Sequence, residues 1–480
     1  MKSNVSVLKS FFWRASQQFS NQLIQFGTQI LLARLLLPEE FGLIALITVF
    51  ITVTRVFVDA GFGQALIQKK DISEKEKSTV FFLNLFIAIL GYTIVYFIAP
   101  FVADFYSISL LKTVLRVQAI VIVIDSLAVV QNSMLVRNLQ FKKSFYINII
   151  GTFVQGVTGV LFALLGFGVW ALVFSQISRS IAHTATIWVI SQWKLRFQFS
   201  LASLKGLSKF GVGILGTGLL NTIFNNINSL LVGWFFSAEI LGFYNKGEQL
   251  PNLVINTVNE PLKAVLFPVM SKMQSNKTAI KEIMKKIMVL GGFIIFPMMM
   301  LLAIIAEPVV ILLMTERWLM AVPFVQIACI KLAFSPIHSA NLEAIKAIGR
   351  SDIFLRLSLI KNIISLVIML FSVQFGVIVF AFGGVFGSLI SLLINILPNH
   401  KLINYSVKEQ FTDILPNLLL TCIVGLIVYS LQLLSFPTYI EMLLQIIIGS
   451  LLYLFLAHAF SFEALKEIKT IVAFYKSESK

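Results

Sequence analysis

Residues 31–70 read LLARLLLPEEFGLIALITVFITVTRVFVDAGFGQALIQKK, and this stretch decides the fold. It predicts the end of one membrane helix, a tight turn at Pro38-Glu39-Glu40, and a second long apolar helix that stops at a basic loop. Arg34, Arg55 and Asp59 fall inside the apolar runs, where an ionisable side chain is costly and usually faces a cavity or a partner.

The same pattern returns near residue 231 as LVGWFFSAEILGFYNKGEQLPNLVINTVNEPLKAV. A second echo lies further along each half of the chain. The matched positions are Glu39 with Glu239, Gly42 with Gly242, and the Phe-Gly-Val triplets at 167–169 and 375–377. A half-length repeat in an apolar chain is typical of two-lobed transporters, and an even number of spans in each copy makes the repeat parallel.

The composition places the whole chain in a membrane. Of 480 residues, 58% are hydrophobic and 12% are charged, whereas a soluble domain carries roughly 25% charged residues. Apolar runs of about 20 residues recur throughout, and the short alternating segments of a β-barrel do not. We therefore expect an all-α polytopic membrane protein with two pseudo-symmetric six-helix lobes and two further C-terminal helices.

We expect about 14 transmembrane helices. The predicted spans are 14–37, 40–66, 78–100, 112–132, 146–165, 168–190, 209–235, 239–267, 284–305, 321–345, 353–373, 377–398, 414–433 and 438–460. They divide into an N-lobe at 1–200 (helices 1–6), a C-lobe at 201–405 (helices 7–12), and 406–480, which holds two additional transmembrane helices and a cytoplasmic tail.

Basic residues gather in alternate loops, which predicts the orientation by the positive-inside rule. Both termini are expected in the cytoplasm, and the basic N-terminus lacks the cleavage site of a signal peptide. The loops predicted to be cytoplasmic are 67–77, 133–145, 191–208, 271–283 and 399–413. The opposite loops are very short and leave no room for an outward catalytic domain.

The charged side chains that we place at membrane depth are eight bases and five acids: Arg34, Arg55, Arg116, Arg179, Lys246, Lys263, Lys331 and Lys361 against Asp59, Asp125, Glu248, Glu260 and Glu343. An interior that leans positive favours an anionic cargo. Arg55 and Asp59 lie four residues apart and can either neutralise each other or line a cavity, and Arg34 can instead extend to the interface. Arg179 and Lys331 have no acid three or four residues away. The candidate cavity bases are Arg34, Arg55, Arg179, Lys246, Lys331 and Lys361.

Helices seven and eight are rich in amides, so they cannot face lipid. Their amides either tie helices together or form a wall that binds sugar hydroxyls. The lone histidines His183 and His338 are interpreted as hydrogen-bonded packing residues. The candidate polar and acidic cavity residues are Asp59, Asp125, Asn221, Asn225, Glu248, Asn252, Asn256 and Glu260.

The sequence carries no pattern of an enzyme, a metal site or a cofactor site. It has no phosphate-binding glycine loop, nucleophile elbow or metal-binding helix. Cys329 and Cys422 lie in apolar runs and are interpreted as packing residues. The net charge of +16 is explained by loop lysines, so no nucleic-acid partner is expected.

The opening segment RASQQFSNQLIQFGTQILLARLLLPEEFGLIALITVFITVTRVFVDAGFGQALIQKK resembles the start of bacterial Wzx-type polysaccharide flippases. The similarity is to the colanic and teichuronic acid exporter branch of the multidrug/oligosaccharidyl-lipid/polysaccharide exporter (MOP) superfamily. It implies a fold like that of the multidrug and toxin exporters (MATE), in the bacterial inner membrane. It also implies alternating access, undecaprenyl-diphosphate-linked oligosaccharide as cargo, and cavity bases that meet the diphosphate. We assign that last role to Arg34, Arg55, Arg179 and Lys331.

The sequence therefore predicts a flippase for lipid-linked repeat units in surface polysaccharide biosynthesis, such as that of O-antigen or exopolysaccharide. The expected partners are the lipid-linked substrate, the bilayer, a polysaccharide polymerase with its chain-length machinery, and a coupling ion, H⁺ or Na⁺. Two alternatives stay open. A cation-coupled multidrug exporter favours an acidic cavity, and a membrane-embedded polymerase needs a large outward loop.

Overall fold

The computed structural model describes residues 2–59, 61–69, 71–191, 193, 195–434 and 436–467. Within these residues, the side chains of 2–12, 14, 15, 201–214, 217 and 260–265 lie outside the description. The described residues form helices and no strand, which confirms the all-α fold class. The chain packs as two units, Met1–Gly242 and Phe243–Lys480. This division by packing does not test the predicted lobe boundaries, which stay a prediction.

Nine helices in the described ranges are long and apolar enough to cross a membrane, or ten if one bent pair counts as a span. That pair joins Ser109–Ser126 to Val129–Arg137 with a bend of 44°. The predicted total of 14 is therefore not confirmed. Every predicted span nevertheless coincides with a helix or a broken helix. The four outside the count, α1, α9, α10 and α11, are 22 to 35 residues long.

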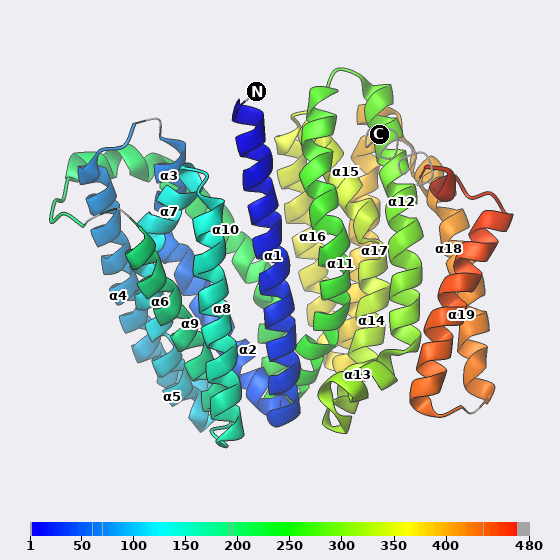
Figure 1. Cartoon of the computed structure of the whole chain (residues 1–480), viewed down its shortest axis with the longest axis horizontal. Coiled ribbons are helices and arrows are strands. Elements are labelled where there is room, and N and C mark those ends of the chain that lie inside the picture. Colours follow the sequence, from blue (N-terminus) through cyan, green and yellow to red (C-terminus); the bar gives the residue numbers. More distant parts are fainter. Residues whose placement is uncertain are drawn as a thin grey trace. The chain divides into compact units, whose positions relative to one another are not determined.

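The first unit holds the helices from α1 to α10 (Figure 1). Their bounds are α1 Lys2–Leu35, α2 Pro38–Asp59, α3 Phe62–Gln68, α4 Glu74–Phe105, α5 Ser109–Gln118, α6 Ile120–Ser126, α7 Val129–Arg137, α8 Phe141–Leu164, α9 Val169–Ile190 and α10 Leu201–Phe235. The predicted spans 40–66 and 112–132 are both interrupted. In this unit α8 packs along α9 and α1, while α2 packs against α4 and α10.

The second unit begins within α11, which spans Ala238–Lys272. The later elements are α12 Lys277–Ile304, α13 Ala306–Met314, η1 Glu316–Ala321, α14 Val322–Ala333, α15 Ser335–Ala347, α16 Ser351–Ser372, η2 Val373–Phe375, α17 Val377–Ile403, α18 Val407–Ser430, η3 Leu431–Leu434 and α19 Thr438–Ala459. The predicted span 321–345 is broken at Phe334, one residue before the helix that carries Pro336 in its first turn.

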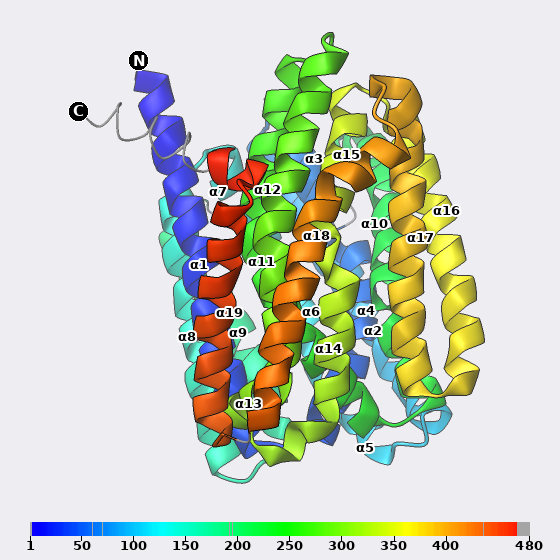
Figure 2. The ribbon, with the colours of Figure 1, turned by 90° about the vertical axis from the view of Figure 1, so that its right-hand side faces the viewer.

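The last two helices lie side by side and pack on α12 (Figure 2). Buried polar groups join them to it. The amide Nδ2 of Asn417 on α18 donates to the carbonyl of Val289, and the hydroxyl of Tyr453 on α19 donates to that of Phe293. Because a polar group in an apolar interior is costly without a partner, these bonds fix α18 and α19 to α12.

The helix boundaries repeat along with the sequence. Helix α1 ends at Leu35 and α2 begins at Pro38, while α10 ends at Phe235 and α11 begins at Ala238. The two Phe-Gly-Val triplets behave alike as well. Gly168 (φ 56°) and Gly376 (φ 99°) each cap the N-terminus of the following helix with a positive φ that favours glycine.

The starts of α2 and α11 touch within the first unit, which runs to Gly242. A methyl group added to Gly42 would lie 1.6 Å from the carbonyl oxygen of Ala238, and one added to Gly242 would lie 2.0 Å from that of Pro38. Both positions therefore need glycine because backbone approaches backbone there. The repeat glycines found in the sequence mark this reciprocal contact.

Candidate functional site

A polar cavity of about 390 Å³ lies inside the first unit. Helices α2, α6, α7, α8 and α9 supply its walls. Its charged and titratable lining residues are Arg55, Asp59, Asp125, Arg179 and His183. The structure thus brings together four of the residues that the sequence predicted to line a cavity, from helices far apart in the chain.

Arg55 pairs with Asp125 through its Nη2 and the carboxylate Oδ2. The second carboxylate oxygen of Asp125 accepts a hydrogen bond of 2.6 Å from the hydroxyl of Ser180 on α9. Of the two alternatives for Arg55 and Asp59, the structure supports cavity lining rather than mutual neutralisation, because the partner of Arg55 comes from α6. Asp59 still lines the same cavity.

Arg179 and His183 stand one turn apart on α9 and line this cavity. In the described part of the chain, neither side chain has an ion-pair or hydrogen-bond partner, so His183 lines the cavity instead of being hydrogen-bonded as predicted. Helix α8 packs closely beneath them, since a methyl group on Gly151 would lie 3.4 Å from the Cβ of His183 and 3.7 Å from the Cγ of Arg179. The Arg179 guanidinium is therefore the cation of this cavity that is available to an anion.

The second unit contains a cavity of about 580 Å³ between α14, α15, α16 and α17. It is more open and has a different lining. Five serines contribute hydroxyls, beside two lysines, a histidine and one acid. These lining residues are Lys331, Ser335, His338, Ser339, Glu343, Lys346, Ser365, Ser388 and Ser391.

Lys331 is paired with an acid from another helix, although no acid lies three or four residues from it in the sequence. Its Nζ contacts the carboxylate Oε1 of Glu248 on α11. That carboxylate also accepts a hydrogen bond of 3.0 Å from the hydroxyl of Tyr244. The side chains of Lys331 and Glu248 are 19% and 22% exposed, so this ion pair is well sheltered.

His338 is held by hydrogen bonds, as expected for a packing histidine. Its Nδ1 lies 3.0 Å from the amide of Asn395, and its Nε2 lies 3.4 Å from the hydroxyl of Ser388. Ser388 itself donates to the backbone oxygen of Lys331 at 3.1 Å. These contacts join α15 and α17 to α14 around the second cavity.

Three of the predicted cavity bases lie outside both cavities. Arg34 is exposed near the end of α1, and Lys361 is half-buried on α16 without lining the second cavity. Lys246 is 5% exposed on α11 and belongs to neither lining. The proposal that these three bases meet the cargo stays a prediction.

The predicted amides do not form a closed cluster in either unit. Asn221 and Asn225 on α10 and Asn256 on α11 are exposed. Asn252 is half-buried, and its amide donates to the carbonyl of Glu248 at 2.8 Å, which stabilises α11 itself. The side chain of Glu260 lies outside the described residues.

Several residues that line the first cavity were not predicted from the sequence. Four amides line the first cavity, and the buried Oε1 of Gln155 has no hydrogen-bond partner among the described residues. The four amides are Asn132, Asn148, Gln155 and Gln176. Two of them, Asn148 and Gln155, lie two turns apart on one face of α8. That periodicity was the available signal.

Together the two cavities offer cations and hydrogen-bonding groups in a membrane-embedded setting. Bases can bind phosphate, and amides and hydroxyls can bind sugar hydroxyls. Within the described residues, no group of three or more histidine, cysteine or acidic side chains is placed to hold a metal ion.

A family model described as "Polysaccharide biosynthesis protein" matches residues 31–323. Among curated proteins, the chain is similar to the teichuronic acid biosynthesis protein TuaB of Bacillus subtilis. The two are 27% identical over 420 residues, which cover 84% of this chain and 85% of TuaB.

Solved transporters share the fold. The lipid II flippase MurJ in an inward closed conformation matches with a TM-score of 0.76 at 16% identity, over 93% of this chain and 98% of MurJ. An inward-facing multidrug resistance MATE family transporter of the MOP superfamily matches with a TM-score of 0.62 at 14% identity, over 82% of this chain and 99% of the transporter. At these identities the likeness concerns the fold, and it confirms the MATE-like architecture.

Proposed function

The chain belongs to the family of polysaccharide biosynthesis proteins, and we propose that it is a flippase for lipid-linked oligosaccharide repeat units. The cargo would be an undecaprenyl-diphosphate-linked sugar unit that crosses the cytoplasmic membrane for the assembly of a surface polysaccharide. The name of TuaB points to an acidic polymer such as teichuronic acid. The fold shared with MurJ supports translocation of a lipid-linked precursor.

The cavity of the first unit carries this proposal. It combines Arg179, which has no ion-pair partner among the described residues, with amides that can bind a glycan. Holding an arginine at membrane depth costs roughly 2.5–3.5 kcal/mol on insertion scales, and a bound diphosphate would offset that cost. A guanidinium can also bind phosphate through two parallel hydrogen bonds.

In this mechanism the diphosphate meets Arg179 and the Arg55–Asp125 pair, and the glycan bonds to amides. The exposed Asn221, Asn225 and Asn256 and the half-buried Asn252 are the proposed sugar contacts outside the two cavities. The polyprenyl tail stays in the bilayer, and the two lobes alternate in opening to either side. We propose an ion gradient of H⁺ or Na⁺ as the energy source and a polysaccharide polymerase as the next enzyme.

The multidrug exporter alternative receives less support. Its cationic cargo favours an acidic site, whereas the available charge of the first cavity is Arg179. The family match also concerns polysaccharide biosynthesis. The polymerase alternative requires a group that carries out catalysis. The turn between α1 and α2, which the charge pattern predicts to be outward, consists of residues 36–37 and offers no space for one.

Replacing Arg179 tests the function. In cells that lack the gene, Arg179→Gln should restore surface polysaccharide about tenfold less well than the unmodified protein, because one charge-assisted bond to phosphate is lost. Lipid-linked units should accumulate in the inner leaflet. Arg179→Lys should recover part of the export, since it keeps the charge without the planar fork.

Arg317→Gln is the matched control, because it removes an exposed arginine of η1 that lines neither cavity. Membrane levels of every variant are measured by immunoblot. Normal export by Arg179→Gln would refute the assigned site. Single units that reach the outer leaflet without being polymerised would refute the flippase and favour a polymerase.

We also propose that the protein lies in the inner membrane with both termini in the cytoplasm. Cysteines are placed one at a time at Asp71 and Ser237, in a chain whose Cys329 and Cys422 are replaced. Both sites are exposed, and Asp71 avoids Ser73, which caps α4. An impermeant thiol reagent should label position 237 and spare position 71 in intact cells. Equal labelling would contradict the topology.

A further inference from the structure

The second cavity extends along its helices for several turns. Its lining residues on α15 run from Ser335 to Lys346, which is about 16 Å of helix, and those on α16 run from Phe354 to Ser365 over the same length. Its volume of about 580 Å³ lies within the range of about 300–1,000 Å³ that is usual for ligand sites. A cavity of this length suits a short chain of linked units better than a single small ion.

Three serine hydroxyls of this cavity have no hydrogen-bond partner among the described residues. They belong to Ser339 on α15, Ser365 on α16 and Ser391 on α17. A helical serine often bonds back to the carbonyl four residues earlier, as Ser358 does to Phe354 at 2.9 Å. The three free hydroxyls come from three different helices, so a ligand in the space that they share can bond to all of these helices.

Ser339 gives an independent sign of a ligand. The residue is 8% exposed, so it is more than nine-tenths buried, and it lines the cavity. A buried hydroxyl without a partner has lost its bonds to water and gained none in return. A ligand that carries hydroxyl groups relieves this loss, because it can both donate to a serine and accept from it.

Two glycines keep the α17 side of the cavity open. An added methyl group would lie 3.5 Å from the Cδ of Lys331 at Gly384, and 3.4 Å from the Oγ of Ser365 at Gly387. These are ordinary contact distances, so packing of the protein does not require glycine at either position. The missing side chains instead allow a ligand to approach the α17 backbone beside the free hydroxyls.

The two lysines that line the cavity are already paired. Lys331 binds Glu248, and the Nζ of Lys346 lies 2.7 Å from the Oε1 of Glu343. The lining therefore presents hydroxyls rather than an unpaired cation. A ligand that is recognised through its hydroxyl groups fits such a lining better than a phosphate does.

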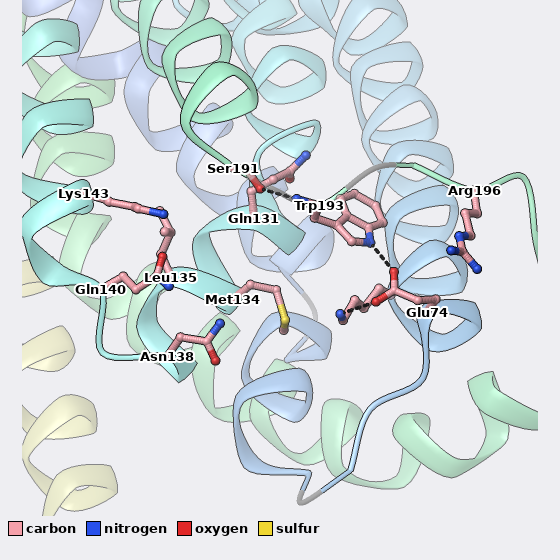
Figure 3. Close-up of a pocket in the computed structure, with 11 residues that line it drawn as sticks. Glu74, Gln131, Met134, Leu135, Asn138, Gln140, Lys143, Ser191, Trp193 and Arg196 are labelled. Atoms are coloured by element: carbon pink, nitrogen blue, oxygen red, sulfur yellow. Dashed lines mark hydrogen bonds and ion pairs between the residues drawn. The ribbon is translucent and has the colours of Figure 1, made fainter.

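A polar pocket at the predicted cytoplasmic end of the first unit offers a contrast (Figure 3). Lys143 and Arg196 stand at opposite sides of it, with Trp193 between them. Glu74 in this pocket already accepts a hydrogen bond of 2.9 Å from the indole of Trp193. The polar groups of that pocket do not converge on one ligand, whereas the free serines of the second cavity line a common space.

We propose that the second cavity binds the sugar chain of the cargo as an extended oligosaccharide. This inference rests on the proposed flippase function and adds a glycan site to the amides named above. The three free serines bond to sugar hydroxyls, and the two glycines let the sugar rings lie close to α17. Since the tenth predicted span, 321–345, ends in the cytoplasm, the Lys346 end of the cavity lies toward the side on which repeat units are loaded.

Protection of introduced cysteines by the cargo tests the site. Ser365→Cys and Ser391→Cys are made one at a time in the full-length chain, with Cys329 and Cys422 replaced, and are labelled with N-ethylmaleimide in membranes. Cells that make the complete lipid-linked unit are compared with cells that cannot attach the first sugar phosphate to the carrier lipid. The complete unit should slow labelling about tenfold, because a ligand in excess keeps its site occupied. A third strain, which stops after the first sugar, should give far less protection.

Ser358→Cys is the matched control, since it is half-buried on α16 and does not line the cavity. Its labelling should not depend on the cargo. The double variant Gly384→Ala with Gly387→Ala should reduce the protection of position 391 about tenfold, as a single added methyl group can do in a binding pocket. It should fold at least as stably, because the added methyl groups meet ordinary contacts and alanine favours a helix. Gly216→Ala should leave the protection unchanged.

Asn148→Cys, in the first cavity, separates this inference from the proposed function. Cargo that protects position 148 but neither 365 nor 391 would overturn the glycan site and leave the flippase standing. Protection at none of the three positions would count against both. Equal protection by the one-sugar unit would overturn the extended chain, since the occupant would then be the diphosphate end of the cargo. Equal protection of position 358 would overturn the site as well.

Discussion

The two units hold their charged cavities together with ion pairs of opposite polarity. In the first unit the base lies on α2 and the acid on α6, as Arg55 and Asp125. In the second the acid lies on α11 and the base on α14, as Glu248 and Lys331. In both units the ion pair joins the second predicted span of the lobe to the fourth. The two lobes therefore share the position of the ion pair, but the base and the acid have exchanged helices.

In each unit a serine on the sixth predicted span of the lobe donates a hydrogen bond to a residue of the ion pair. Ser180 lies eleven residues after Val169 (180−169), and Ser388 lies eleven after Val377 (388−377). Ser180 donates to the carboxylate of Asp125, whereas Ser388 donates to the backbone oxygen of Lys331. The two equivalent serines therefore both bond to a residue of the ion pair, one through a carboxylate and the other through a backbone carbonyl.

The cavities also differ in their free charge. At the position that corresponds to Arg179 by the same alignment, the second unit has Gly387, which lines its cavity. The first cavity is thus amide-lined with an available guanidinium, and the second is serine-lined with its central lysine paired.

The largest expected effect on stability concerns the close contact between the start of α2 and the start of α11. Gly42→Ala and Gly242→Ala should each lower the free energy of unfolding by about 3 kcal/mol, because the added methyl group meets backbone oxygen at 1.6 or 2.0 Å and cannot be accommodated by a side-chain rotation. Thermal unfolding of the purified protein in detergent measures the loss.

Gly216→Ala is the control, since nothing lies within 4 Å of the added methyl group. That change should be neutral or stabilise α10 by up to about 1 kcal/mol, as expected for alanine in a helix. If Gly42→Ala proves as stable as Gly216→Ala, the starts of α2 and α11 do not approach each other as described.

The ion pairs should respond unequally to neutralisation. Glu248→Gln leaves Lys331 without its sheltered partner and should cost up to about 3 kcal/mol. Asp125→Asn should cost only about 1 kcal/mol, because the side chains of Arg55 and Asp125 are 43% and 34% exposed and solvent screens them. The unfolding midpoint in detergent reports both changes.

An exchange of charges sharpens this test. The double variant Glu248→Lys with Lys331→Glu should recover much of the stability that either single variant loses, since it restores an ion pair with the polarity of the first unit. Glu316→Gln, an exposed acid in η1, should change nothing measurable. Equal losses of stability for Glu248→Gln and Asp125→Asn would mean that the lower solvent exposure of the Lys331–Glu248 pair does not make it the more important of the two.

The features that the sequence predicted well are those encoded locally. Glu39 and Gly42 mark the start of α2, and their repetition as Glu239 and Gly242 locates the start of α11 at Ala238. Hydrophobic runs place the long helices, but they cannot reveal the breaks between α5, α6 and α7, where the chain stays apolar. The total of 14 spans was therefore beyond what apolar runs alone could establish.

The sequence predicted which charged residues line the first cavity, but not which of them form an ion pair. Charges in apolar runs identified Arg55, Asp59, Asp125 and Arg179 as members of a polar interior, because each is too costly to face lipid. Local spacing offered only Asp59 as a partner of Arg55, whereas helix packing supplied Asp125. Partners from distant helices, such as Glu248 for Lys331, leave no signal in a single sequence.

The serines provide the finest test of the comparison. Ser180→Ala removes a donor to a charged carboxylate, so it should lower the free energy of unfolding by about 1.5 kcal/mol. Ser388→Ala removes a donor to a neutral carbonyl and should cost only about 0.5–1 kcal/mol. In an Asp125→Asn background the effect of Ser180→Ala should shrink to that of Ser388→Ala, since the acceptor is then neutral as well. An unchanged effect in that background would show that Ser180 acts through packing of α9, and the two serines would then share a position without sharing a role.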